Sequence, residues 1–112
     1  MADKPLGAWS VAGMNQLAQQ IAEWRESKGF TTPDTIEDTF HLLGKLALVH
    51  SELSEAVEAV RSGNADNFSE ELADTIIRIL DLTGTMGIDI EQAIADKMTV
   101  NCGREHKHGR KA

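Results

Sequence analysis

Four carboxylates in the middle of the chain have a spacing that could hold a metal ion. Glu52 and Glu55 are three residues apart, and so are Glu71 and Asp74. On an α-helix, residues three apart lie on the same face, one turn from each other. Between the two pairs lies SGNAD, a cluster of turn-forming residues that predicts a reversal between two helices. The two acidic pairs are therefore expected to face each other across a helical hairpin.

Carboxylates that converge between packed helices repel one another unless a cation lies among them. Hard oxygen ligands of this kind select Mg²⁺, Mn²⁺ or Ca²⁺. A single acidic pair is usually only a solvent-exposed helix face, because charged side chains are mostly exposed. Here there are two pairs, and both lie among apolar residues, as in ELADTIIRILDL around the second. We therefore expect half-buried carboxylates that bind a divalent cation.

The order of these acids resembles that of the MazG-like nucleoside triphosphate pyrophosphohydrolases, which belong to the all-α NTP pyrophosphatase superfamily. The hallmark of that family is E-E-x-x-E, a spacer of variable length, and then E-x-x-D. In this chain Ser51 takes the place of the first acid, and the spacer is formed by residues 56–70. The resemblance continues through GID, K-x-x-x-N-x-x-R and a closing HGRK, and so covers roughly residues 40–111.

The resemblance implies a reaction and a cofactor. The reaction would be the Mg²⁺-dependent hydrolysis of a nucleoside or deoxynucleoside triphosphate to the monophosphate and pyrophosphate, with Mn²⁺ as a substitute metal and the clearing of aberrant nucleotides as its role. Glu52 and Glu55 would act in catalysis and, together with Glu71 and Asp74, bind the metal. Because Ser51 has no carboxylate, the identity of the general base stays open.

The resemblance also implies that a basic segment near the end of the chain meets the phosphates. Lys97, Asn101 and Arg104 follow one another at steps of four and three, which places them on one stripe of a helix and just beyond it. The basic tail at residues 103–112 continues this stripe. Ammonium and guanidinium groups suit a triphosphate.

Three further residues are candidate substrate contacts with competing interpretations. Lys45 lies on the same side of its helix as the first acidic pair, and is either a phosphate contact, a partner of the acids or a surface lysine. Arg78 belongs to a polar stripe with Asp74 and Asp81, and is expected to neutralise one of these aspartates. Trp24 is either a core residue or a surface on which a nucleobase stacks.

Hydrophobic periodicity predicts an all-α fold of about four helices, in which the second and third form a central antiparallel hairpin. Gly44, inside the second helix, is expected to mark a kink or a close helix contact. Cap and turn residues place the first helix from Ser10 to Gly29, the second from Thr32 or Asp34 towards Arg61, the third from Asn67 or Ser69 to Met86, and the fourth after Asp89. The predicted core stripes are Met14, Leu17, Ile21 and Trp24 on the first helix and Leu42, Leu43, Leu46, Val49, Leu53, Val57 and Val60 on the second.

Length and charge restrict the class of protein. A chain of 112 residues is a single domain, residues 1–112, with a modest core, so that we expect a homodimer or homotetramer to complete the helical bundle. A net charge of −7 disfavours nonspecific binding to nucleic acid or to an anionic membrane. The single cysteine excludes an intrachain disulfide, and no signal peptide or long apolar run is present. These features predict a soluble, cytoplasmic protein.

Two other functions stay open. The first is a specialised hydrolase of the same superfamily, acting on dUTP, dCTP or phosphoribosyl-ATP. The second is a noncatalytic helical module that uses the acidic hairpin for metal-dependent assembly or for binding a partner. A di-iron bundle is disfavoured, because neither Glu52 nor Glu71 has a histidine three residues later.

Overall fold

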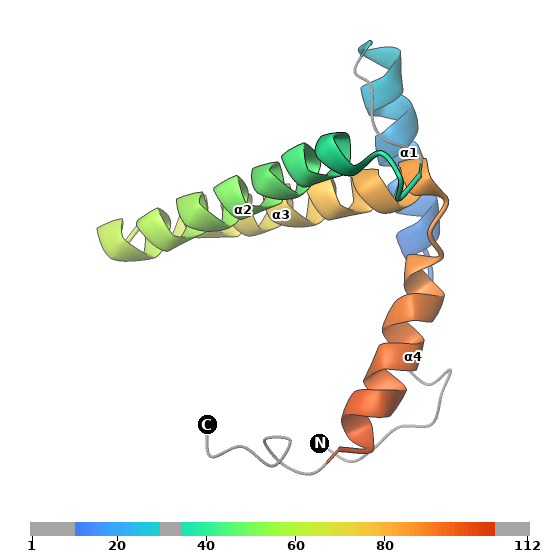
Figure 1. Cartoon of the computed structure of the whole chain (residues 1–112). Coiled ribbons are helices and arrows are strands. Elements are labelled where there is room, and N and C mark those ends of the chain that lie inside the picture. The colour runs from blue at the N-terminus through green and yellow to red at the C-terminus, as the bar shows by residue number, and fades with distance from the viewer. Residues whose placement is uncertain (1–10, 30–34, 105–112) are drawn as a thin grey trace.

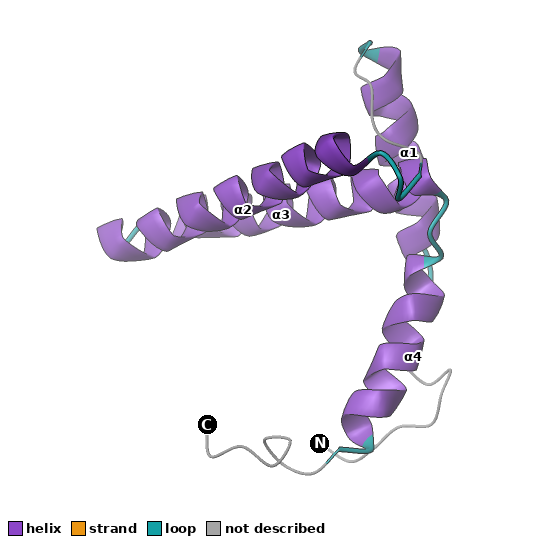
Figure 2. Ribbon diagram, in the orientation of Figure 1, coloured by secondary structure: helices purple, strands orange, loops and turns teal. Residues whose placement is uncertain are grey.

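The computed structural model describes residues 11–29 and 35–104. Within these residues the chain forms four α-helices and no strand, which confirms the predicted all-α fold (Figure 2). The helices are α1 (Met14–Ser27), α2 (Thr39–Ser62), α3 (Ala65–Met86) and α4 (Ile90–Cys102). The helices α2 and α3 lie side by side as an antiparallel hairpin, and α1 crosses α3 near the base of that hairpin (Figure 1). None of the four described helices combines the length and hydropathy that a membrane span requires.

The hairpin turn is built from the residues that the sequence indicated. Gly63 follows α2 and has a φ of 71°, a left-handed conformation that glycine adopts without strain. Asn64 then caps α3, since its Oδ1 accepts a hydrogen bond from the backbone N–H of Asn67 at 3.1 Å. Because Asn64 is the cap, α3 begins at Ala65, ahead of both predicted starts.

Two other predicted helix starts are wrong. The helix α1 begins at Met14 rather than after Ser10, because the preceding glycine has a left-handed φ of 89° that the helix cannot include. The helix α2 begins at Thr39, after a turn, and not at Thr32 or Asp34, two residues that lie outside the described part of the chain.

Small residues bring α1 very close to α3. A Cβ atom added to Gly84 of α3 would lie 2.3 Å from the backbone carbonyl oxygen of Ala18, so only glycine fits there. Ala18 and Ala22 are the buried residues of α1. The close helix contact expected at Gly44 is thus found at Gly84 instead, and among the described residues nothing lies within 4 Å of a Cβ built on Gly44.

The predicted core stripes lie largely on the surface of the single chain. On α2 only Leu42 of the predicted stripe is buried, and the helix contact is made by Ala56 and Ala59. The short side chains of these alanines let the backbones of α2 and α3 approach each other. The longer apolar side chains of α2 lie mostly outside this helix contact. The predicted core residues that are exposed are Leu17, Trp24, Leu43, Leu46, Leu53, Val57 and Val60.

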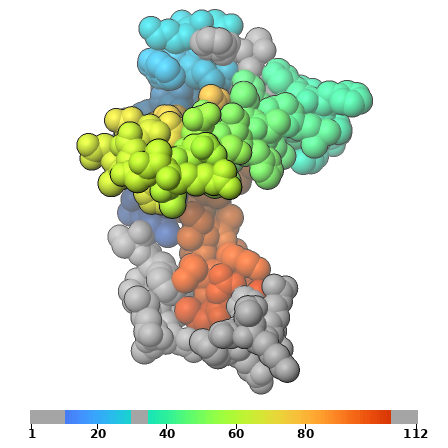
Figure 3. Space-filling model, turned by 90° about the vertical axis from the view of Figure 1, so that its left-hand side faces the viewer, coloured from blue at the N-terminus to red at the C-terminus, as the bar shows by residue number. Residues whose placement is uncertain are grey.

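The last helix, α4, extends from the rest of the molecule as a separate arm that packs mainly against α1 (Figures 1 and 3). Asp89 caps it as predicted, since its Oδ1 accepts a hydrogen bond from the N–H of Gln92 at 3.0 Å. Asn15 of α1 holds the same turn, because its Oδ1 accepts from the N–H of Ile90 at 3.0 Å and its Nδ2 donates to Asp89 at 2.8 Å. The joint between α1 and α4 therefore consists of directional hydrogen bonds.

Candidate metal centre and substrate cleft

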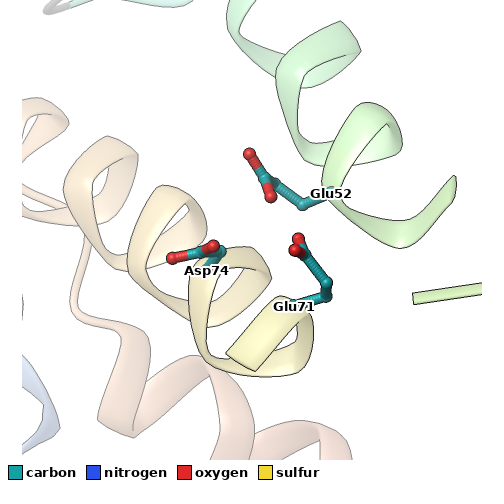
Figure 4. A group of neighbouring side chains, drawn as sticks. All are labelled: Glu52, Glu71 and Asp74. Atoms are coloured by element: carbon teal, nitrogen blue, oxygen red, sulfur yellow. The ribbon is translucent and has the colours of Figure 1, made fainter. Parts of the chain in front are cut away.

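Three carboxylates converge across the hairpin. Glu52 comes from α2, and Glu71 and Asp74 come from consecutive turns of α3. One oxygen of each lies within 4.8 Å of the others, and Figure 4 shows the three side chains directed into the same space between the helices. The side chain of Glu52 is 16% exposed, so at least part of this acidic group is shielded from water.

The electrostatics of the acidic group favour a bound cation. The pKa of Glu71 is raised, first by its hydrogen bond with Glu52, then by burial and by the charges of Glu52, Asp74 and Glu55. The pKa of Glu52 is lowered, first by its hydrogen bond with Arg78 and then by that with Glu71. The crowding of negative charge disfavours the ionised form of Glu71. Carboxylate oxygens in this arrangement fit Mg²⁺ or a similar hard divalent cation, which would remove the repulsion.

Glu55, the fourth predicted acid, lies at the margin of this group. Its side chain is exposed, and no oxygen of it belongs to the cluster of three. It is nevertheless close enough for its charge to raise the pKa of Glu71. Its role as a metal ligand or catalytic residue stays a prediction.

Arg78 pairs across the hairpin rather than along its own helix. Its Nε lies 2.9 Å from Oε1 of Glu52, so it does not neutralise Asp74 or Asp81 as the sequence led us to expect. Asp81 is paired instead with Arg25 of α1, whose Nε lies 2.5 Å from its Oδ2. The sequence contained one hint of this contact, an arginine at the end of the apolar stripe of α1, next to Trp24.

A cleft of about 260 Å³ adjoins the acidic group and lies between α1, α2 and α3. Two members of the acidic group, Glu52 and Asp74, lie on its wall, and Trp24 lies there too, with 61% of its surface exposed. Trp24 is therefore not a core residue of the single chain, and its role in stacking on a nucleobase stays a prediction. The other residues lining the cleft are Ile21, Arg25, Ile77, Arg78 and Asp81.

A family model for the MazG nucleotide pyrophosphohydrolase domain matches residues 39–108, which is more than half of the chain. The chain belongs to this family. The resemblance seen in the acidic motif is thereby confirmed, and membership indicates a nucleotide pyrophosphohydrolase in general terms. A search of curated proteins and a search of solved structures gave no match.

The MazG match begins at α2 and excludes α1. It contains the acidic hairpin and α4, whereas Trp24 and Arg25 lie outside the matched residues. One wall of the cleft is therefore supplied by a part of the chain that the family model does not describe.

The predicted cationic stripe is not brought to the cleft within one chain. Lys97 and Asn101 lie on α4, and Arg104 follows that helix, which is directed away from the hairpin (Figure 1). Lys45 is half-buried on α2, and it is not among the residues lining the cleft. Most of the predicted basic tail, residues 105–112, lies outside the described part of the chain.

Proposed function

We propose that this MazG domain hydrolyses nucleoside or deoxynucleoside triphosphates to the monophosphate and pyrophosphate, with Mg²⁺ as cofactor. The observation that carries the proposal is the convergence of Glu52, Glu71 and Asp74 beside a cleft that also contains an exposed tryptophan. Acids alone would suit any cation site, and a tryptophan alone would suit many ligands. Together they suit a ligand with a flat ring at one end and anionic oxygens at the other.

The chain's own residues have separate tasks in this reaction. Glu52, Glu71 and Asp74, with Glu55 beside them, would hold Mg²⁺, or Mn²⁺ in its place. When bound, the ion supplies positive charge that offsets charge developing on the phosphates and lowers the pKa of water. Glu52, kept ionised by Arg78, or Glu55 would accept the proton of the attacking water.

The remaining contacts orient the substrate. Arg78 lies on the cleft and can donate to a phosphate oxygen with those N–H groups that Glu52 does not use. Trp24 would stack on the base, and Ile21 and Ile77 would complete an apolar wall. Lys45 and the stripe of Lys97, Asn101 and Arg104 are proposed to meet the phosphates once chains assemble.

Assembly into at least a homodimer forms part of the proposal. The hairpin exposes apolar residues on both of its helices, among them Val57 at 54% and Ile76 at 54%. Covering such a face with a second copy would remove apolar surface from water, at about 25 cal/mol for each Å². We further propose that the protein acts in the cytoplasm on free nucleotides and binds neither nucleic acid nor membranes, in line with its net charge of −7.

The test is product analysis with a panel of ribo- and deoxyribonucleoside triphosphates, dUTP, dCTP and phosphoribosyl-ATP included. With Mg²⁺ we expect monophosphate and pyrophosphate in equal amounts, and neither product in the presence of a chelator. Release of inorganic phosphate and a diphosphate would contradict the proposal, because the wrong bond would have been cut. A single preferred substrate would identify a specialised member of the superfamily.

A matched pair of variants ties the reaction to the acidic group. Asp74→Asn should lower kcat by at least about 100-fold, because it removes a charge that the metal requires. Glu70→Gln, a similar change at an exposed position of the same helix, should leave kcat unchanged. Circular dichroism checks that both variants keep their helices. Equal activity of the two variants would place the reaction elsewhere.

A further inference from the structure

The cleft contains a second charged pair that the proposed hydrolysis does not use. Arg25 and Asp81 form an ion pair in which each side chain is only 12% exposed. Arg25 also donates from Nη2 to Oγ1 of Thr85 at 3.5 Å. Both partners line the cleft, one from the last turns of α1 and the other from the C-terminal half of α3.

The Arg25–Asp81 ion pair fixes the orientation of α1 relative to α3 more than it stabilises the fold. A buried ion pair contributes little net stability, because desolvation of the two charges offsets their attraction. Separating the partners is costly, however, because each then becomes an unpaired buried charge. Among the described residues, Nη1 of Arg25 and Oδ1 of Asp81 are buried without a hydrogen-bond partner, so the ion pair is the main compensation for burying these two charges. The pair therefore holds α1 in one rotation relative to α3.

The ion pair and the close contact at Gly84 are two separate contacts within the same helix crossing. Ala18 and Arg25 are seven residues apart on α1, so they lie on the same side of that helix, two turns from each other. Gly84 and Asp81 are three apart on the facing side of α3. Two contacts, one steric and one ionic, thus fix both the distance and the rotation of α1.

The position of Trp24 follows from this arrangement. Trp24 immediately precedes Arg25, so the direction in which its side chain leaves α1 is determined once Arg25 is held. Asp81 is seven residues from Asp74 on α3, which places it on the same face as the acidic group. The ion pair therefore fixes the distance between Trp24 and the carboxylates of the acidic group.

We infer that Arg25 and Asp81 are positioning residues that hold Trp24 at the wall of the cleft, where its indole stacks on the nucleobase of a substrate whose phosphates lie at Glu52 and Asp74. This inference rests on the proposed function and assigns a task to α1. The ligand class is a nucleotide with a planar heteroaromatic base. Because the pair acts through Trp24, it affects the binding of substrate more than the rate of its cleavage.

A double-mutant cycle tests the link to Trp24. Trp24→Ala should raise KM for a nucleoside triphosphate by about ten-fold, the usual scale of a base–aromatic stack, with little change in kcat. Asp81→Asn should raise KM by part of that factor, and the double variant should have the KM of Trp24→Ala alone. If the two factors multiply instead, Asp81 acts independently of Trp24 and the inference is wrong.

A fluorescence measurement separates this inference from the proposed function. The chain has two tryptophans, so a Trp9→Phe protein reports on Trp24 alone. In that background, Asp81→Asn should lower the fluorescence anisotropy of Trp24 and increase its quenching by acrylamide, with or without nucleotide. Unchanged fluorescence would overturn the inference even in an active enzyme. A wild-type protein that hydrolyses no nucleotide would instead defeat the proposed function.

A milder variant is available in case Asp81→Asn does not fold. Arg25→Lys keeps the charge but loses the planar fork of the guanidinium, so it should loosen Trp24 in the same assays. Arg61→Lys is the matched control, because Arg61 pairs with Glu58 on the surface, where its side chain is 75% exposed. If Arg25→Lys and Arg61→Lys both leave the anisotropy and KM unchanged, the pair does not position Trp24.

Discussion

The helix α3 has two neighbours, α1 and α2, and they are held against it by different means. Contact with α1 depends on Gly84, where no side chain fits, and on one buried ion pair, Arg25 with Asp81. Contact with α2 depends on Ala56 and Ala59 and on a short turn. A short turn keeps two helices adjacent at small entropic cost, whereas α1 has no such connection to α3 and needs specific contacts. The α2–α3 contact is thus maintained by a short turn in the chain, whereas the α1–α3 contact is maintained by specific side-chain contacts.

The site draws on both neighbours. The hairpin of α2 and α3 brings Glu52 to Glu71 and Asp74, and its geometry follows from the turn. The helix α1 contributes Trp24 and Arg25, and so completes the cleft on the side away from the turn. Damage to the α1 contact should therefore change how substrate is bound, while damage to the hairpin should change whether metal is bound.

The largest effect on stability is expected at Gly84. Gly84→Ala would place a Cβ atom 2.3 Å from the backbone oxygen of Ala18, and α1 would have to move away. We expect a loss of at least about 2 kcal/mol in the free energy of unfolding, measured by urea denaturation.

Gly44→Ala is the matched control for that change. Gly44 lies within α2, where an added Cβ meets nothing within 4 Å among the described residues. The substitution should raise the free energy of unfolding by up to about 1 kcal/mol, because alanine favours the helix. If Gly84→Ala and Gly44→Ala lowered the free energy of unfolding equally, the α1–α3 contact would not require glycine at position 84.

An intermediate effect is expected on the exposed apolar face of the hairpin. Val57→Lys should weaken self-association by about ten-fold or more, because it places a charge in a surface that a second copy would cover. Sedimentation equilibrium measures the dissociation constant. Glu58→Lys adds the same group at the neighbouring position, whose side chain is 67% exposed in an ion pair, and should have a smaller effect. Equal dissociation constants for both variants would argue that another surface forms the oligomer.

The smallest effect concerns the joint between α1 and α4. Hydrogen bonds, first from Asn15 and then from the N–H of Gln92, lower the pKa of Asp89. The ionised form of Asp89 is thus favoured in the folded state. Its contribution to stability is fully present above the ordinary pKa of an aspartate. This contribution is lost as the pH falls through the lowered pKa that Asp89 has in the folded protein. Thermal melts of wild type and Asp89→Asn should differ most at neutral pH and converge at acidic pH. Parallel curves would mean that the charge of Asp89 plays no part in the joint.

Features that depend on neighbouring residues could be read from the sequence. The turn at SGNAD, the cap at Asp89 and the end of α3 at Met86 were all predicted, because each depends on a few adjacent residues. The approach of Glu52 to Glu71 and Asp74 also followed from helical spacing and one reversal, whereas Glu55 lies outside that group. The catalytic, metal-binding and substrate-binding roles of all these residues stay predictions, and Glu55, Lys45 and the stripe on α4 also lie apart from the group of three carboxylates.

Features that depend on distant residues could not be read in the same way. Long side chains at helical spacing predicted the core, but Ala18, Ala56 and Ala59 make the contacts, because short side chains permit the closest approach of helix axes. Arg78 was expected to pair within its own helix, yet Glu52 on α2 lies nearer in space. Helical periodicity states which residues share a face, and it does not state which face a neighbouring helix will cover.

The sequence by itself therefore determined the all-α fold, the central hairpin and the membership of the MazG family, which the family model confirms. These features result from short-range backbone preferences and from spacing along a helix. Only the tertiary structure decided that Trp24 borders the acidic group and that Arg25 pairs with Asp81. Both depend on how α1 crosses α3, and that crossing is set by steric fit at Gly84 between residues far apart in the chain.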